Sequence, residues 1–192
     1  AEDVSIMRSI PGMTVIVPAD PVQTAAAVRW AIAEHDGPTY IRISRMKVPA
    51  VHAPDYSFTP GKATVLRQGQ DLTIVSNGTA LHRALAAAAA LEGQGVSVRV
   101  LSMASVKPLD EQAVMDAARQ TGRIVVAEEG MAAGGLGGAV AELVSAGHPV
   151  PVTRIGVPDV FAPTGSEEWL MDRFGISAGG IAAAARDLLK RG

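Results

Sequence analysis

Two arginines, Arg42 and Arg45, combine residue type and position in a way that suits the binding of an anion. They lie at the end of, and just after, the alternating segment Thr39 to Ile43, which predicts a strand. Ligands of open α/β sheets gather at the carboxyl edge, where a guanidinium can hold a phosphate through two parallel hydrogen bonds. The spacing alone also allows a surface salt bridge, so both interpretations stay open at this point.

A glycine-rich segment, Gly130 to Gly138 (GMAAGGLGG), follows a predicted strand and opens a predicted helix. Free N–H groups at a helix N-terminus can hold a phosphate, and glycine permits close approach of the backbone. The glycines do not have the G-x-G-x-x-G spacing of a dinucleotide fingerprint. Tight packing of this loop, or contact with another subunit, is therefore the competing interpretation.

We expect the other candidate residues, two glutamates and four histidines, to have no catalytic role. Glu128 and Glu129 end a strand side by side, and neighbouring side chains on a strand face opposite ways, so we expect hydrogen bonding or helix capping. The histidines lie in four different predicted elements without ligand spacing, which favours surface or linker positions. They are His35, His52, His82 and His148. The sequence contains no nucleophile elbow, P-loop or zinc signature.

The elements that position these residues fall into two blocks. The first block predicts a strand–helix–strand unit of the kind that builds parallel sheets. Asp20 and Pro21 suit the N-cap and the first position of its helix. The expected elements are a short helix at 3–9, a strand at 13–17, a helix from 20 to about 35 and a strand at 39–43.

A stretch with three prolines, Val48 to Lys62, separates the blocks and predicts an extended inter-domain linker. In the second block, short apolar runs alternate with helical stretches of 3.6-residue period. The runs are Leu72–Ser76, Val96–Leu101, Ile124–Ala127 and Val152–Ile155. This alternation is typical of a doubly wound α/β sandwich.

Composition argues against several functional classes. The 192 residues include 17 basic and 19 acidic side chains, for a formal charge of −2, without the basic clusters of a nucleic-acid surface. Because there is no cysteine, disulfides and thiolate metal sites are excluded. The longest apolar stretch, Ala84 to Leu91, is far shorter than the ~20 residues of a membrane span. No signal peptide is visible, so we expect a cytoplasmic protein without a membrane partner.

Several motifs occur in an order that carries a family resemblance. They are Glu2–Met13 (EDVSIMRSIPGM), Pro18–Pro21 (PADP), Gly37–Arg45 (GPTYIRISR), Lys107–Asp110 (KPLD), Val126–Glu129 (VAEE), Gly134–Gly137 (GGLG) and the stretch from Arg154 to the end. The sequence resembles the C-terminal portion of a transketolase, and most of all the C-terminal subunit of split bacterial transketolases. The likeness extends over essentially the whole chain.

The resemblance implies a domain organisation. Residues 1–47 would be the C-terminal part of the thiamine pyrimidine-binding domain, and residues 48–62 a linker. Residues 63–192 would be the transketolase C-terminal domain, a mixed sheet with one antiparallel strand. The fold class is then α/β, a partial parallel domain joined to a doubly wound one.

The resemblance also implies chemistry and partners. Family members transfer a two-carbon ketol unit between sugar phosphates with thiamine diphosphate and a divalent metal such as Mg²⁺. We do not expect that cofactor to bind stably to this chain alone. An N-terminal transketolase subunit or domain would be the partner, in a homodimer or heterotetramer.

Carried over residue by residue, the resemblance makes Arg45 the arginine that grips the substrate phosphate, with Arg42 as a second substrate ligand. Glu2 and Arg8 match family residues without an assured chemical role. The family's catalytic residues would lie upstream of Ala1. Alternatives are a chain like 1-deoxyxylulose-5-phosphate synthase or the β chain of a 2-oxo-acid dehydrogenase, a non-catalytic assembly domain, or a stand-alone anion- or nucleotide-binding domain.

Overall fold

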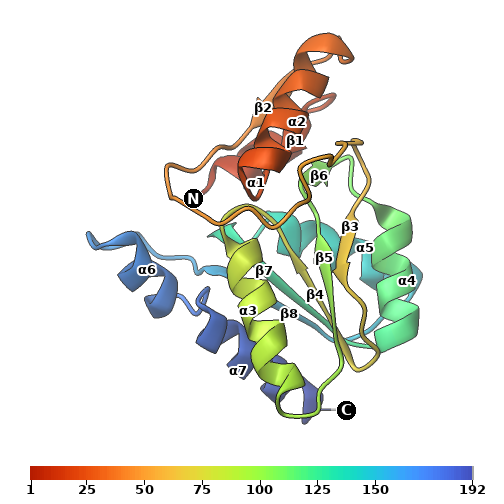
Figure 1. Ribbon diagram of the computed structural model, residues 1–192, viewed down its shortest axis with the longest axis vertical. Coiled ribbons are helices and arrows are strands. Elements are labelled where there is room, and N and C mark those ends of the chain that lie inside the picture. Colours follow the sequence, from red (N-terminus) through yellow and green to blue (C-terminus); the bar gives the residue numbers. More distant parts are fainter. Residues whose placement is uncertain (192) are drawn as a thin grey trace.

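The structure, a computed structural model, describes residues 1–191 and contains two β-sheets, one above the other in the view of Figure 1. The upper sheet has the strand order β2-β1-β6 and lies between two helices. Its elements are α1 (Asp3–Ser9), β1 (Thr14–Ile16), α2 (Pro21–Ala33), β2 (Thr39–Ile41) and β6 (Ser105–Lys107).

Alternation along β1 sends its side chains to opposite faces of the upper sheet. Val15 packs with Val4 of α1, whereas Ile16 packs with Ala26 and Trp30 of α2. β1 pairs in parallel with β2, as the strand–helix–strand pattern predicts. On its other side β1 pairs antiparallel with β6, which comes from the second half of the chain. β6 is not predicted from the sequence, because three residues are too few to show a period.

The lower sheet has five strands in the order β3-β5-β4-β7-β8, all parallel except β3, which runs antiparallel to β5. Its strands are β3 (Thr64–Arg67), β4 (Leu72–Ser76), β5 (Val98–Ser102), β7 (Ile124–Met131) and β8 (Val152–Val157). Its helices are α3 (Ala80–Glu92), α4 (Glu111–Thr121), α5 (Leu136–Gly147), α6 (Glu167–Arg173) and α7 (Ala178–Leu189). The α/β fold class, including one antiparallel strand in the larger sheet, is confirmed; β3 and α6 were not foreseen.

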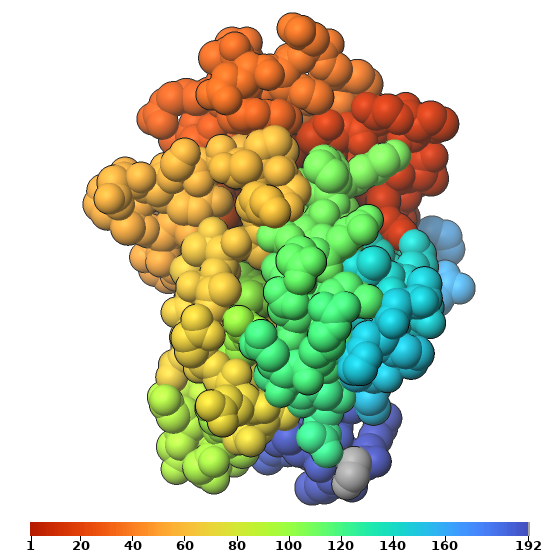
Figure 2. Space-filling model, turned by 90° about the vertical axis from the view of Figure 1, so that its right-hand side faces the viewer, coloured from red at the N-terminus to blue at the C-terminus, as the bar shows by residue number. Residues whose placement is uncertain are grey.

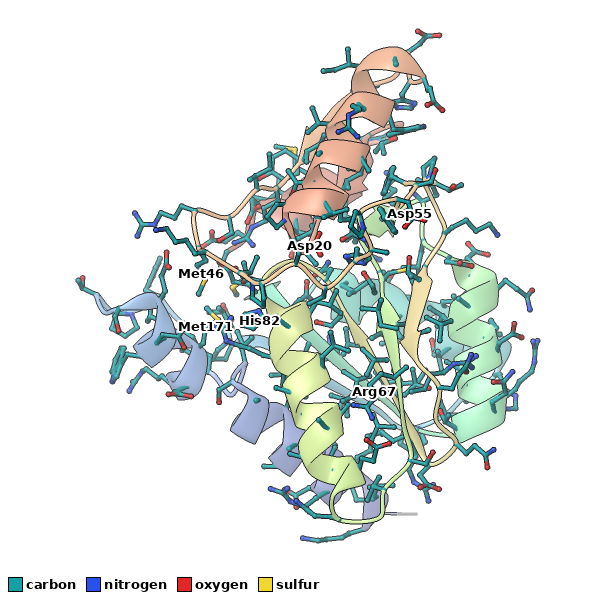
Figure 3. All side chains as sticks on the ribbon, in the orientation of Figure 1. Asp20, Met46, Asp55, Arg67, His82 and Met171 are labelled. Carbon is teal, nitrogen blue, oxygen red and sulfur yellow. The ribbon has the colours of Figure 1, made fainter. Side chains whose placement is uncertain are left out.

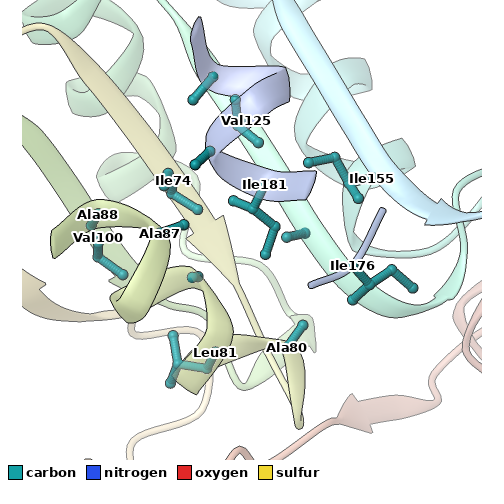
Figure 4. Packing of buried hydrophobic residues seen from close by; sticks show 14 of the residues in the cluster. Ile74, Ala80, Leu81, Ala87, Ala88, Val100, Val125, Ile155, Ile176 and Ile181 are labelled. Carbon is teal, nitrogen blue, oxygen red and sulfur yellow. The ribbon is translucent and has the colours of Figure 1, made fainter. Parts of the chain in front are cut away.

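Two apolar layers enclose the lower sheet. On one face α3 and α7 pack against it, and alanines of α3 such as Ala87 and Ala88 let this helix come close to Ile74 and Val100 (Figure 4). On the other face α4 and α5 cover Val75 and its neighbours. Among residues 1–191, no helix is long and apolar enough to cross a membrane.

The lower sheet has a topological switch point between β4 and β7. From β4 the chain passes through α3 to β5 on one side, and later through α4 to β7 on the other side. In doubly wound sheets, the crevice for a ligand opens at the carboxyl ends of two such strands. The contacts around these strand ends therefore decide whether this crevice is open to a ligand.

The linker from Val48 to Lys62 is ordered by burial and by hydrogen bonds. Phe58 is only 7% exposed and joins the apolar core of the upper sheet. Figure 2 shows this stretch, coloured orange to gold, lying along the junction between the N-terminal residues and the rest of the molecule. Unlike a solvated spacer, the linker therefore forms part of the packed structure.

The carboxylate of Asp20 holds the linker and caps a helix at the same time. Its Oδ1 accepts the N–H of Gln23, 2.8 Å away, as the predicted N-cap of α2. Its Oδ2 accepts the N–H groups of Val51 and His52 at 2.7 and 2.8 Å. Figure 3 shows Asp20 at the junction of the two layers.

Asp110 repeats this arrangement at the other end of the linker. Its Oδ1 accepts the N–H of Ala113 at 3.0 Å, which caps α4, and its Oδ2 accepts the N–H of Ala63 at 2.8 Å. One acidic side chain at each end thus satisfies both a helix terminus and linker backbone that is not part of a sheet.

Burial alone would raise the pKa of the Asp20 carboxyl. The N–H groups of Gln23, His52 and Val51 outweigh this effect and leave the pKa below its ordinary value. A lowered folded-state pKa means that the stabilisation is present above the unfolded pKa of about 3.9. It is lost as the pH falls through the folded value.

We predict that Asp20→Ala lowers the free energy of unfolding by about 2–4 kcal/mol at neutral pH, because it removes a cap and leaves two linker N–H groups without an acceptor. Ser177→Ala is the matched control, since Ser177 caps α7 through Gly180 without holding a second segment. It should cost about 1 kcal/mol. Urea unfolding measures both, and equal losses would contradict the linker role of Asp20.

Candidate functional site

Arg42 lies between two carboxylates that come from different layers. Its Nε is 3.1 Å from Oδ2 of Asp3 on α1, and its Nη2 is 3.4 Å from Oε1 of Glu129 on β7. The side chains of Arg42 and Glu129 are each 18% exposed. This guanidinium therefore joins the carboxyl edge of the upper sheet to the carboxyl edge of the lower one.

Further contacts close the switch point from the upper side. The N–H of Gly78, just after β4, donates to the carbonyl of Val17 after β1 at 3.1 Å. The hydroxyl of Thr79 donates to the second oxygen of Glu129. Residues of the upper layer thus lie over the carboxyl ends of β4 and β7, where the fold would otherwise place a ligand.

The first helix, α1, adds further contacts between the upper and lower layers. The guanidinium of Arg8 donates to the carbonyl of Gly134 at 2.8 Å and pairs with Glu142 of α5. Lys107 donates from its ammonium to the carbonyls of Arg8 and Ile10, at 3.0 and 2.7 Å. A cation beside the last carbonyls of α1 also matches the negative end of the helix dipole. Arg8, which the family motif left without a role, holds the two layers together.

The carboxyl of Asp3 is tuned by this environment. Burial alone would raise its pKa, but the hydrogen bond from the Tyr40 hydroxyl, 2.7 Å away, and the charge of Arg42 outweigh it and lower the pKa. For Tyr40, burial and the adjoining Asp3 carboxylate both raise the pKa of the phenol. Asp3 therefore stays ionised next to Arg42 at neutral pH.

The glycine-rich loop holds an internal anion at the start of α5. Oε2 of Glu128 accepts the N–H of Leu136 at 2.9 Å, and Oε1 accepts the N–H of Gly137 at 2.8 Å. A Cβ at Gly135 would lie 2.3 Å from Oε2 of Glu128, which explains the glycine there. Glu128 is 3% exposed. The close-packing interpretation of this loop is thus confirmed, because a buried carboxylate already occupies the place where a phosphate would bind.

Glu128 and Glu129 point to opposite sides of β7, as the alternation of a strand predicts. Glu128 accepts hydrogen bonds at the N-terminus of α5, and Glu129 accepts one from Thr79 and pairs with Arg42. Their expected structural role is confirmed.

Arg45 differs from Arg42 in that its side chain is 89% exposed. Its Nε lies 3.0 Å from Oε1 of Glu167, in the first turn of α6. The two arginines of the sequence motif therefore do not converge on one binding site. Arg42 faces the junction of the two layers, and Arg45 faces solvent. Nothing in the local sequence pattern indicated Glu167 as a neighbour.

A groove of about 600 Å³ opens at the segment that follows β2, although Arg45 itself does not line it. The neighbours of Arg45 in sequence, Ser44 and Met46, line it together with Lys47, and Thr79, just before α3 of the lower layer, also lines it. Asp20 and Pro21 at the N-terminus of α2 also border it. The groove thus lies at the carboxyl ends of β1 and β2, the edge where ligands of such sheets bind.

His52 lies in the linker, one of the two placements expected for the histidines, but its side chain is buried and only 6% exposed. Its Nδ1 is 2.9 Å from Oδ2 of Asp20, and its Nε2 is 3.0 Å from Oγ of Ser102. This order resembles a hydrolase triad, but Ser102 is 1% exposed and no substrate reaches it. The network secures the linker against β5, and only the position of His52 within the linker was foreseen.

Within residues 1–191, no group of three or more His, Asp and Glu side chains could hold a metal ion.

With this geometry in hand, comparison with known proteins identifies the family. Residues 61–181 match the transketolase C-terminal domain, and residues 1–51 match the transketolase pyrimidine-binding domain. The chain belongs to the transketolase family, and the resemblance found in its sequence motifs is confirmed. The boundaries at 47 and 62 stay a prediction.

The most similar relatives include subunits of transketolases. The 6-deoxy-6-sulfo-D-fructose transketolase subunit of Clostridium sp. (strain MSTE9) is 45% identical over 99% of this chain and 59% of its own length. One of the subunits of the apulose-4-phosphate transketolase of Phocaeicola vulgatus is 37% identical over 98% of this chain and 60% of its own length. The chain thus spans about three-fifths of these relatives.

A solved structure shares the fold closely. It is a split-gene transketolase, described as an inactive β4 tetramer, with a TM-score of 0.95 and 46% sequence identity. The match covers 98% of this chain and 62% of that one.

The buried carboxyl of Glu128 makes the free energy of unfolding depend on pH. Burial raises its pKa, and the N–H groups of Gly137 and Leu136 and the charges of Arg42 and Arg8 oppose this without cancelling it. A raised folded-state pKa gives stabilisation that is complete below the ordinary pKa of about 4.3 and is lost as pH rises through the folded value.

We therefore predict that the wild type loses stability relative to Glu128→Gln, which does not titrate, as the pH rises from about 4 to about 8. Urea unfolding of both proteins across this range gives the difference directly. A difference that stays constant with pH would show that the Glu128 carboxyl is not perturbed.

Proposed function

We propose that this chain is the C-terminal part of a two-component, thiamine-diphosphate-dependent transketolase acting on sugars that end in an oxyanion. The observation that carries this proposal is the exposed guanidinium of Arg45, whose neighbours in sequence, Ser44 and Met46, line a groove at the carboxyl edge of the upper sheet. In this proposal Arg45 binds the anionic end of the sugar, and the groove receives its carbon chain.

The chemistry of the anion supports an arginine at this place. A guanidinium presents parallel N–H donors that match two oxygens of a phosphate or a sulfonate. The two relatives are named for 6-deoxy-6-sulfo-D-fructose and for apulose 4-phosphate, sugars that both carry a terminal oxyanion. Lys47, which lines the groove two residues further on, adds a second positive charge.

That Arg42 also binds the substrate stays a prediction. Its guanidinium is engaged by Asp3 and Glu129, so a substrate oxyanion would compete with two carboxylates for it. We therefore propose that Arg42 mainly positions the end of β2, and with it Ser44 and Arg45, against the lower layer.

Enzymes of this family use thiamine diphosphate with a divalent metal. The described residues do not fit the metal and diphosphate, since they contain no suitable cluster of ligands. We propose that another subunit or domain supplies that site and that this chain binds and orients the distal end of the sugar. The cofactor supplies the carbanion chemistry when it is bound.

The proposed partner is an N-terminal transketolase component, in a homodimer or a heterotetramer. The similar split-gene enzyme is described as inactive in the form of a β4 tetramer. That description supports the need for a second component here.

Mixing the two components should produce a larger species in size-exclusion chromatography and the appearance of ketol transfer.

We predict that Arg45→Ala, in the complete enzyme with its diphosphate-binding component, raises KM for an anionic sugar about 10- to 100-fold, the loss of one or two charge-assisted hydrogen bonds. The kcat should change little, because the contact lies at the end of the substrate away from the reacting carbonyl. Steady-state kinetics with D-fructose 6-phosphate measures both constants.

Arg67→Ala is the matched control, since Arg67 pairs with Glu92 far from the junction of the layers (Figure 3). It should leave KM unchanged. An unchanged KM in Arg45→Ala would refute the role given to this arginine.

A further inference from the structure

Glu167 is the carboxylate that faces the proposed anion-binding guanidinium. It belongs to α6, in the lower layer, whereas Arg45 follows β2 in the upper layer. The loop carrying Met46 and the helix carrying Met171 lie on the same side of the molecule (Figure 3). A contact between residues so distant in sequence brings a negative charge to the place where a negatively charged substrate would bind.

The position of Glu167 is set by contacts other than its pair with Arg45. Met171, one turn further along α6, is 6% exposed and anchors the helix in the apolar core. Glu168 accepts a hydrogen bond at 2.9 Å from Arg83, whose side chain is only 6% exposed. Ser166 caps the helix through the N–H of Trp169. The helix therefore presents Glu167 to Arg45 whether or not the two interact.

The pair itself is solvated and easily displaced. Arg45 is 89% exposed and Glu167 is 38% exposed. Ion pairs in such surroundings contribute little to stability, because water screens them and two long side chains lose freedom. A substrate oxyanion that makes two parallel hydrogen bonds to Arg45 can replace the single contact of Glu167 at Nε.

We propose that Glu167 is a specificity-determining residue of the anion site, an inference that rests on the proposed function of Arg45. Its carboxylate pairs with the guanidinium of Arg45 until substrate binds, and it then stays close to the bound oxyanion. Because α6 keeps the carboxylate near, it repels a bound dianion more than a bound monoanion. Glu167 thus shifts the preference of the site from sugars ending in a phosphate toward sugars ending in a sulfonate.

Two sugars separate these cases by charge. D-Fructose 6-phosphate is mainly a dianion at about pH 8, since the second pKa of a phosphate ester is about 6. 6-Deoxy-6-sulfo-D-fructose, the sugar in the name of one relative, carries a single negative charge on its sulfonate.

The experiment compares Glu167→Gln with the wild type in the complete enzyme at about pH 8. We expect Glu167→Gln to lower KM for the phosphate sugar roughly two- to fivefold and to lower it less for the sulfonate sugar. The kcat should stay unchanged for both. Calorimetric titration of the cofactor-free enzyme with the same sugars gives the dissociation constants, which should fall in the same order.

Two further variants show whether the effect belongs to the Glu167 position. Asp172→Asn removes one negative charge from an exposed position of the same helix and should leave both KM values as they are. Glu168→Gln weakens the contact of α6 with Arg83 and should not reproduce the difference between the sugars.

Three results would overturn the inference: unchanged constants in Glu167→Gln, an equal gain for both sugars, or the same shift in Asp172→Asn. None of them affects the role of Arg45, which Arg45→Ala tests separately. Conversely, if Arg45→Ala leaves KM unchanged, the proposed function fails whatever Glu167→Gln does.

Discussion

The ion-paired bridge from Asp3 through Arg42 to Glu129 is the interaction on which the arrangement of this chain depends. It joins α1 and the end of β2 to the carboxyl end of β7, and it is supported by the contact of Gly78 with Val17. Because these residues cover the switch point between β4 and β7, the lower sheet cannot use that crevice for a ligand. The transketolase C-terminal domain thus fixes the position of the carboxyl edge of the upper sheet, whose strands β1 and β2 belong to the pyrimidine-binding domain.

Two arginines three residues apart consequently have different environments. In the short coil after β2, Arg42 faces the junction of the two layers, whereas Arg45 lies at the surface, between two residues that line the groove. A guanidinium committed to two carboxylates gains little from a substrate anion, whereas an exposed one with a single weak partner gains more. We therefore propose that Arg42 has a structural role and that Arg45 binds the substrate, because their side chains have different partners.

Much of the fold could be predicted from the sequence, because periodicity and caps are local signals. The β1–α2–β2 unit, the cap at Asp20 and the opposite directions of Glu128 and Glu129 all follow from such signals. What could not be predicted depends on distant segments meeting. β6 pairs with β1 although the two are far apart in the chain, and Asp20 also holds the linker through His52. The motif identified Arg45 as a candidate, but no local pattern shows that Glu167 would face it.

A crystal structure of the complete enzyme with a sugar phosphate or sugar sulfonate bound would show directly which arginine holds the anion. We expect the terminal oxyanion to lie about 3 Å from the guanidinium nitrogens of Arg45. It also predicts that Arg42 remains between Asp3 and Glu129, as it does without a ligand. An oxyanion bound away from Arg45, or Arg42 released from both carboxylates to hold it, would contradict the account.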